Sequence, residues 1–323
     1  MPVYNCEPYL KEAIDSILNQ TYADFDFLII NDASTDKSED IILSYSDPRI
    51  IYLKNETNLR LVGTLNRGLD CISTPYMVRM DGDDISTPDR LAKLLDFMES
   101  HPEIGVCGSF IETFGNDNSI WKYNETDEMI RPCIFYKSMV GHASAIFRMS
   151  VLNHHQIRYS ERHIHMEDRV MWLSLFSIAK FHNLQEALYK YRILEHNVTV
   201  RNRETLSERV TRFYEELFPE FGIECTNNLL QIHLGYTDLL NFEEKEITNY
   251  ITWLEKLRFS HFDVNLGLTK FAMNFHYKIM ESRFVNRAKA TGNGAIIWIS
   301  TKNETLFKRI LLVLRSKLKR NNH

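Results

Sequence analysis

The sequence has few cysteines, no long apolar run and no excess of basic charge. Its five cysteines are odd in number and widely spread over 323 residues, and no Cys-x-x-Cys pair occurs. This pattern excludes a disulfide framework and a cysteine-based zinc module, and it predicts reduced thiols in a cytosolic protein. No apolar run approaches the roughly 18 residues of a membrane-spanning helix, and no signal peptide is recognisable before the first predicted strand. We therefore expect a cytoplasmic protein.

Net charge limits the class of partner further. The formal charge is -5 at pH 7, whereas a nucleic-acid-binding surface needs clustered lysine and arginine to follow the phosphates. We therefore expect no nucleic-acid partner. Hydrophobic residues make up 44% of the chain, which at this length is enough for one large core and a smaller second one.

Strand-like and helix-like segments alternate through the first hundred residues. The strand-like apolar runs lie at 25–30, 50–53, 76–80 and 104–107, and helical spacing of apolar residues occurs at 10–18, 61–72 and 88–98. This is the β-α-β rhythm of an α/β protein with a mostly parallel sheet flanked by helices. Ligands of such sheets bind outside the carboxyl ends of the strands.

Carboxylates stand at the ends of two of these predicted strands. Asp-Gly-Asp-Asp at 81–84 directly follows one strand, and Asp32 lies just beyond another. In an extended segment residues i and i+2 project to the same side, so Asp81 and Asp83 would aim at one divalent cation or at a ligand beside it. A solvated acidic turn is the simpler interpretation of an isolated motif. Two acidic strand ends on one edge of a sheet favour a shared site.

Four segments of the first two hundred residues together form a specific pattern. They are Pro-Val-Tyr-Asn at 2–5, Asn-Asp-Ala-Ser-Thr-Asp at 31–36, Arg-Met-Asp-Gly-Asp-Asp at 79–84 followed by Pro-Asp-Arg-Leu at 88–91, and Met-Glu-Asp at 166–168 ahead of Trp172. In this order and spacing the chain resembles the bacterial family 2 glycosyltransferases, which are inverting enzymes. The resemblance implies a Rossmann-like GT-A domain over residues 1–200 that binds a nucleotide sugar.

The resemblance implies roles for the matched positions on the nucleotide side. Pro2, Val3 and Tyr4 would line the pocket for the nucleotide base. Asp32 would accept a hydrogen bond from that base, and Asp81 would lie near the ribose. A carboxylate favoured by the dipole of the next helix is the simpler alternative for Asp32.

The resemblance also implies the groups that act on the reacting atoms. Asp83 would bind a divalent metal, Mn²⁺ or Mg²⁺, which would stabilise the departing nucleoside diphosphate. Asp168 would be the general base that takes the proton of the attacking acceptor hydroxyl. One direct displacement then inverts the anomeric carbon without a covalent enzyme intermediate. The alternative for Asp168 is an ordinary acidic residue in the first turn of a helix.

Four further residues are candidates for the diphosphate or acceptor side. Arg60 stands where many family members have glycine, and it either reaches the diphosphate or belongs only to a loop. His142 and His196 lie in segments that border the diphosphate or acceptor in the family, although a lone histidine beside a strand is more often structural. Glu167 precedes the candidate base. Trp172, on the same predicted helix, is better explained as a core residue than as a sugar-stacking platform.

Residues 201–323 fall outside the family pattern and have helical periodicity. We expect a helical C-terminal region there. Its segment 306–320 combines apolar and basic residues in a way that suits an anionic membrane surface. The alternative is a helix docked on the protein with a solvated basic face. The membrane interpretation predicts an enzyme peripheral on the inner face of the membrane and a lipid-linked acceptor.

The sequence thus predicts a metal-dependent inverting glycosyltransferase of the hexosyl or N-acetylhexosaminyl class. It would move a sugar from a nucleotide sugar, most simply a UDP-sugar, to a glycan or lipid-linked acceptor in surface polysaccharide synthesis. Two alternatives stay open. A sugar nucleotidyltransferase would need a glycine-rich loop where the chain has Asn-Cys-Glu-Pro at 5–8. The other alternative is a catalytically inactive relative that serves as a glycan-binding or scaffold protein. The very short first strand expected around residues 2–5 favours this alternative, and the intact carboxylates count against it.

Overall fold

The computed structural model describes residues 1–163, 165–194, 203–234, 246, 249–250 and 252–253. The chain divides into two compact units, Met1–Leu206 and Ser207–His323, and each is described by itself. His196 and the basic segment 306–320 lie outside the described residues. All five cysteines lie inside them, and all five are free thiols.

A parallel three-stranded sheet opens the first unit. Its strands are β1 (Pro2–Val3), β2 (Phe27–Asn31) and β3 (Ile50–Lys54), in the order β1-β2-β3, and its helices are α1 (Glu7–Leu18), α2 (Ser38–Leu43) and α3 (Arg60–Cys71). The pattern predicted β2, β3, α1 and α3 to within a few residues. Helix α1 buries Leu10, Ala13, Ile14 and Ile17, which share one face because they repeat at helical spacing.

A second sheet of six strands follows. Its members are β4 (Tyr76–Val78), β5 (Ile85–Ser86), β6 (Ile104–Gly115), β7 (Ile120–Trp121), β8 (Ile146–Arg148) and β9 (Lys180–Ile193). The strand order is β4-β8-β6-β9-β5, with β7 on β6, and β6 with β9 is the parallel pair. Strand β4 pairs antiparallel with β8. The α/β class is therefore confirmed. This sheet contains both parallel and antiparallel pairs, whereas a mostly parallel sheet was expected. The difference arises because periodicity reveals a strand and not its partner.

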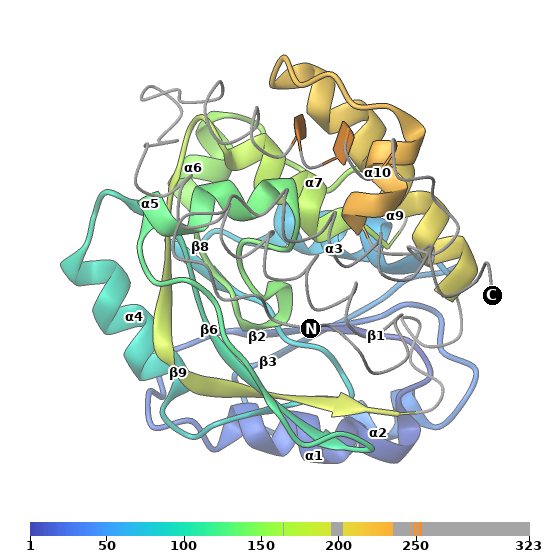
Figure 1. Ribbon diagram of the computed structural model, residues 1–323. Helices are drawn as coiled ribbons and strands as arrows, with labels where there is room; N and C mark the ends of the chain where they lie inside the picture. The colour runs from blue at the N-terminus through green and yellow to red at the C-terminus, as the bar shows by residue number, and fades with distance from the viewer. Residues whose placement is uncertain (164, 195–202, 235–245, 247–248, 251, 254–323) are drawn as a thin grey trace. The chain divides into compact units, whose positions relative to one another are not determined.

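Helices and short turns complete the first unit around the second sheet (Figure 1). They are α4 (Arg90–Ser100), α5 (Asp127–Ile130), η1 (Arg131–Phe135), η2 (His142–Ser144), α6 (Met149–His154) and α7 (Glu167–Leu175). Leu94 and Met98 of α4 pack against Ile104 and Cys107 of β6 and against Ile146. Helix α4 thereby holds the long strand β6 in place, and β6 in turn pairs with the short strands β7 and β8.

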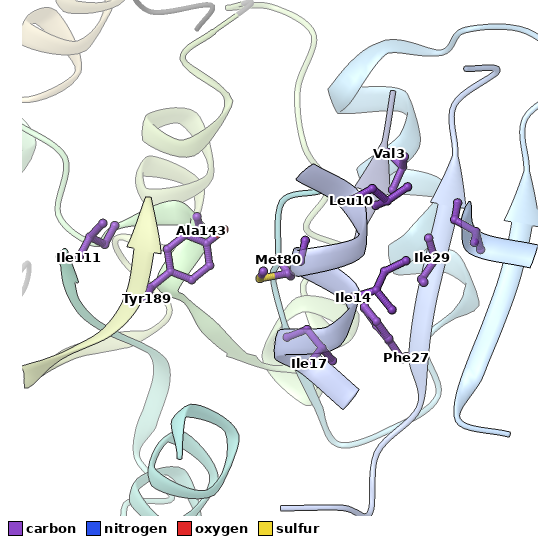
Figure 2. Close-up of a cluster of buried hydrophobic side chains, with 12 residues drawn as sticks. Val3, Leu10, Ile14, Ile17, Phe27, Ile29, Met80, Ile111, Ala143 and Tyr189 are labelled. Carbon is purple, nitrogen blue, oxygen red and sulfur yellow. The ribbon is translucent and has the colours of Figure 1, made fainter. Parts of the chain in front are cut away.

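One hydrophobic cluster joins the two sheets at the acidic loop. Figure 2 shows Met80 between the apolar face of α1 and Tyr189 of β9. Met80 and Tyr189 are 3% and 0% exposed, and full burial of such a side chain contributes about 1.5–3 kcal/mol. Because Met80 directly precedes Asp81, this packing fixes where the acidic loop begins.

The described part of the second unit is helical. It contains most of α9 (Arg203–Glu220), together with α10 (Asn227–Leu234). The His233 ring contacts an aromatic group made of Tyr214, Phe218, Tyr250 and Trp253. Within the residues that the structure describes, no helix combines the length and apolar character needed to cross a bilayer.

Candidate active site

Asp32 lies immediately beyond the carboxyl end of β2. Its backbone N–H donates to the Val3 carbonyl at 2.8 Å, so the ends of β1 and β2 are tied together. Its Oδ1 accepts hydrogen bonds from Asn55 Nδ2 at 2.6 Å and from the Leu59 backbone N–H at 2.8 Å. Leu59 immediately precedes α3, and a carboxylate at a helix start is favoured by the helix dipole. The side chain is therefore held through one oxygen, while Oδ2 accepts nothing from the described residues.

The acidic loop bends at Gly82. Residues 82 and 83 form a turn, so the extended-chain argument for placing Asp81 and Asp83 on one side is wrong. A Cβ at Gly82 would lie 3.0 Å from Cys6 Sγ and 3.5 Å from Val3 Cγ2. The absence of a side chain thus lets the loop pack against the end of β1. This contact brings the acidic loop beside β1, the strand whose Val3 carbonyl also accepts the hydrogen bond from the Asp32 backbone N–H.

Asp81 belongs to a buried ion pair. Arg79 Nη1 donates to Asp81 Oδ2 at 2.7 Å, and the arginine side chain is 7% exposed. Burial alone would favour the neutral arginine, but the Asp81 charge outweighs it, and the pKa of Arg79 is raised. The Asp81 backbone N–H donates to the Tyr189 hydroxyl at 3.2 Å. The position of Asp81 is therefore fixed through both its side chain and its backbone.

Asp83 and Asp84 are adjacent carboxylates that are largely shielded from solvent. Burial and then repulsion from Asp81 raise the pKa of Asp83 to about 6 and that of Asp84 to about 8. Asp84 accepts hydrogen bonds from the Tyr189 hydroxyl and from the Arg192 backbone N–H, each at 2.8 Å. It therefore anchors the loop. No described side chain donates to the Asp83 carboxylate, so that group is free to bind a ligand.

The acidic loop suits a cation that is bound jointly with substrate. In the described part of the chain, no three His, Cys, Asp or Glu side chains converge as a metal site. Mg²⁺-type ions at phosphate sites use one or two protein carboxylates and take their other ligands from substrate phosphates and water. Crowded carboxylates with raised pKa values fit this pattern, because a bound cation relieves their repulsion.

Asp168 lies in the first turn of α7. Its Oδ2 accepts a hydrogen bond from Ser138 Oγ at 3.1 Å. Tyr159, in the loop before α7, is a buried phenol whose pKa is raised, mainly by burial, with smaller effects from Asp168 and Asp81. Burial also raises the pKa of Glu167, and the charge of Arg79 opposes that shift. The start of α7 and the acidic loop therefore act electrostatically on the same buried groups.

His142 packs beside Tyr159 and Trp172. Its Nε2 and the Tyr159 hydroxyl are 2.8 Å apart, and its ring meets the edge of Trp172 at 6.0 Å. Burial, and then the charge of Arg79, hold the pKa of His142 well below its usual value. The imidazole is therefore neutral at pH 7. The structure also places Trp172 fully in the core, stacked on Phe147, which confirms the core interpretation of this residue.

The remaining predicted positions differ in exposure. Val3 is 1% exposed and packs into the core, whereas Tyr4 is 50% exposed and open to a ligand. Pro2 is half-buried beside them in β1. Arg60 is exposed and has a φ of 60° at the start of α3. A left-handed conformation suits glycine, which explains the glycine that many family members have at this position.

These arrangements agree with the comparison to known families. The family model described as Glycosyl transferase family 2 matches residues 1–180. The chain is a family 2 glycosyltransferase. It is 35% identical over 201 residues to the putative glycosyltransferase EpsE of Bacillus subtilis, an alignment that covers 59% of this chain and 71% of EpsE.

Two further proteins are similar to this glycosyltransferase. The Escherichia coli enzyme WfgD, named as a UDP-Glc:α-D-GlcNAc-diphosphoundecaprenol β-1,3-glucosyltransferase, is 27% identical over 175 residues, which cover 54% of this chain and 67% of WfgD. The crystal structure of Staphylococcus aureus TarS 1–349 with UDP-GlcNAc superposes with a TM-score of 0.59 and 17% identity, covering 90% of this chain and 88% of TarS. The structural likeness confirms the GT-A fold.

Sequence reasoning missed several residues that hold the site of this glycosyltransferase together. They are Asn55, Ser138, Tyr159, Tyr189 and Arg192. Four of them donate a hydrogen bond to Asp32, Asp84 or Asp168, and Tyr159 pairs with His142. Arg79 was part of the recognised motif, but no role was assigned to it. Arg79 could have been predicted as the ion-pair partner of Asp81, because it lies two residues before that carboxylate and a poorly solvated charge needs a partner.

Proposed function

We propose that this glycosyltransferase transfers a sugar from a UDP-sugar to a glycan or lipid-linked acceptor, with inversion, in surface polysaccharide synthesis. One observation carries the proposal. Arg79, the ion-pair partner of Asp81, donates its backbone N–H to the Ala145 carbonyl at 3.1 Å, directly after η2. The His142 ring on η2 contacts Trp172, and both Trp172 and Asp168 hydrogen-bond Ser138. Packed residues thus connect a carboxylate suited to the donor with one suited to the acceptor. An inverting displacement needs groups on two sides of one anomeric carbon.

On the donor side, the proposal gives a separate role to each acid. Asp32 and the half-exposed Tyr4 would bind the nucleotide base, with Pro2 and Val3 supporting them, and Asp81 would face the ribose. Asp83 would hold Mn²⁺ or Mg²⁺, which supplies positive charge to the departing diphosphate. Asp84 would keep the loop in place through Tyr189 and Arg192.

On the acceptor side, Asp168 would take the proton of the attacking hydroxyl. A general base must lie within hydrogen-bond reach of that proton, and Asp168 has one oxygen, Oδ1, without a partner among the described residues. Glu167 and the buried pair of His142 and Tyr159 would form the wall of this pocket. The neutral state of His142 fits a wall residue better than a diphosphate ligand.

The similar proteins support the choice of donor and acceptor. TarS was crystallised with UDP-GlcNAc, and the name of WfgD gives a UDP-sugar donor and a diphosphoundecaprenol-linked acceptor. A lipid-linked acceptor would place the enzyme on the inner face of the membrane as a peripheral protein. The alternative of an inactive glycan-binding relative is disfavoured by the intact set of carboxylates.

Calorimetric titration tests the donor site directly. We expect UDP to bind in the presence of Mn²⁺, more tightly than GDP or dTDP. Asp83→Asn should weaken metal-dependent UDP binding at least about tenfold, which corresponds to roughly 1.4 kcal/mol. Asp96→Asn, which changes an exposed aspartate of α4, should bind UDP as the wild type does. Absence of binding by folded wild-type protein for all three nucleotides would contradict the proposal.

A further inference from the structure

A chain of hydrogen bonds leads from the core to the candidate base. Trp172 Nε1 donates to Ser138 Oγ at 3.1 Å, and Ser138 Oγ in turn donates to Asp168 Oδ2 at 3.1 Å. Trp172 is fully buried, stacked on Phe147 and meeting Phe181 edge-on. The chain of hydrogen bonds therefore ends in a large, fully buried side chain.

Helix geometry explains why these groups meet. Asp168 and Trp172 are four residues apart on α7, so they lie on the same face of the helix, one turn apart. Ser138 approaches that face from the segment between η1 and η2 and bridges the two side chains. A carboxylate held at one oxygen by a group fixed to the core has few orientations left.

The Ser138 hydroxyl has a choice of acceptors. Its oxygen lies 2.9 Å from the Val140 carbonyl as well as 3.1 Å from Asp168 Oδ2. A hydroxyl has a single proton, so it makes one of these bonds at a time, while Trp172 occupies an oxygen lone pair. An ionised carboxylate is the stronger acceptor. The bond to Asp168 is therefore favoured when the carboxylate is charged and weakened once that group has taken a proton.

We propose that Ser138, backed by Trp172, is a positioning residue that holds Oδ2 of Asp168 and leaves Oδ1 to take the proton of the acceptor hydroxyl. This inference rests on the proposed function, in which Asp168 is the general base. In the transfer step the acceptor oxygen forms the new bond to the anomeric carbon with its own electron pair. Its proton passes to Asp168, and the pair of the broken carbon–oxygen bond leaves with UDP. Ser138 neither gains nor loses a proton.

Other ionisable groups lie within reach of the charge of this carboxylate. They are Glu167 on α7, Tyr123 before α5 and Tyr159 before α7. A test therefore needs a variant that removes only the hydroxyl and leaves these groups in place.

Kinetics of Ser138 variants supply that test. We expect Ser138→Ala to lower kcat about tenfold, as expected for one lost hydrogen bond to a charged group, with the donor KM within about twofold. The loss should fall on kcat and not on donor binding, because Ser138 holds the proposed base. Ser138→Thr keeps the hydroxyl and should restore kcat.

A matched control separates positioning from general damage. Ser144 is fully buried and bonds the Gly141 and Ser109 carbonyls without touching Asp168. Ser144→Ala should lower the Tm and leave kcat close to the wild-type value. If Ser138→Ala does not fold, Ser138→Cys, a weaker donor of similar size, should also lower kcat.

The outcomes distinguish this inference from the proposed function. An unchanged kcat in folded Ser138→Ala or Ser138→Cys, or a threonine variant as impaired as the alanine variant, overturns the positioning role. Asp168→Asn that retains wild-type kcat overturns the base assignment itself, whatever the serine variants do. Asp168→Asn without activity but with normal UDP binding leaves the base assignment standing, so the serine variants then decide.

Discussion

The proposed donor side and the proposed acceptor side of this site hold their carboxylates in different ways. On the donor side, which is the loop 81–84 with its contacts, an arginine binds Asp81, and a tyrosine hydroxyl and a backbone N–H bind Asp84. On the acceptor side, which is the start of α7, Asp168 has a single serine hydroxyl. Several closely spaced charged groups suit the binding of a cation and a diphosphate. A carboxylate with a single hydrogen-bond partner suits a general base, which must accept a proton and release it again.

Arg79 is the ion-pair partner of Asp81, and its loss should have the largest effect on stability. Arg79→Met would leave the Asp81 charge without its partner. For a fully buried pair this costs about 3–5 kcal/mol of unfolding free energy, and because Asp81 is 21% exposed we expect a loss at or below the lower end of that range. Chemical denaturation of the variant measures this loss. Arg158→Met, which breaks an ion pair with Asp70 on the surface, should cost at most about 1 kcal/mol. Equal losses in the two variants would contradict a buried ion pair at the centre of the site.

The double variant sharpens this result. Arg79→Met combined with Asp81→Asn removes both charges and should recover part of the lost stability, because neither group is then left charged and unpaired. UDP affinity would remain low, since Asp81 is assigned to the nucleotide. Full additivity of the two single losses would indicate that the pair does not interact.

The neutral His142 predicts how the acceptor side responds to pH. Its pKa is lowered in the folded state by burial and by Arg79, so below about pH 6.5 the unfolded chain takes up a proton that the folded chain does not. The free energy of unfolding should therefore fall as the pH drops below about 6.5, by up to about 1.4 kcal/mol per pH unit. Denaturation at pH 5.5 and 7.5 measures this difference.

His142→Gln isolates the contribution of this side chain. The variant should show a flatter pH dependence than the wild type, although it loses some stability at pH 7.5. His155→Gln, at an exposed position, should keep the wild-type dependence. An unchanged slope in the His142 variant would mean that the imidazole is protonated in the folded protein.

The smallest expected effect lies on the donor side, at the start of α3. Arg60 has a φ of 60°, which costs a residue with a Cβ roughly 1 kcal/mol, so Arg60→Gly should raise the unfolding free energy by about that amount. Lys11→Gly, inside α1, should instead lower it by about 0.5–1 kcal/mol. UDP titration of the Arg60 variant tests its assignment to the nucleotide, since unchanged affinity would make Arg60 a loop residue alone.

Local pattern determined most of the first half of the first unit. The apolar run that became β2 and the helical spacing of α1 are visible in the sequence, because burial imposes a period on neighbouring residues. The same local reasoning placed Asp32 and the acidic loop beyond strand ends. Strand β4 was also recognised, but its antiparallel partner β8 was not, since a run of three residues carries little periodic signal.

The sequence by itself determined the family, the acidic motifs and the order of strands and helices in the first half of the first unit, since each is encoded within a short window. Tertiary structure decided which groups those acids meet. Asp84 finds Tyr189 from 105 residues away, and Ser138 reaches Asp168 across 30. The turn at Gly82 likewise follows from packing against Cys6, which no local pattern reveals. Such partners depend on how whole elements pack, because a buried charge must be satisfied by whatever the fold brings within about 3 Å of it.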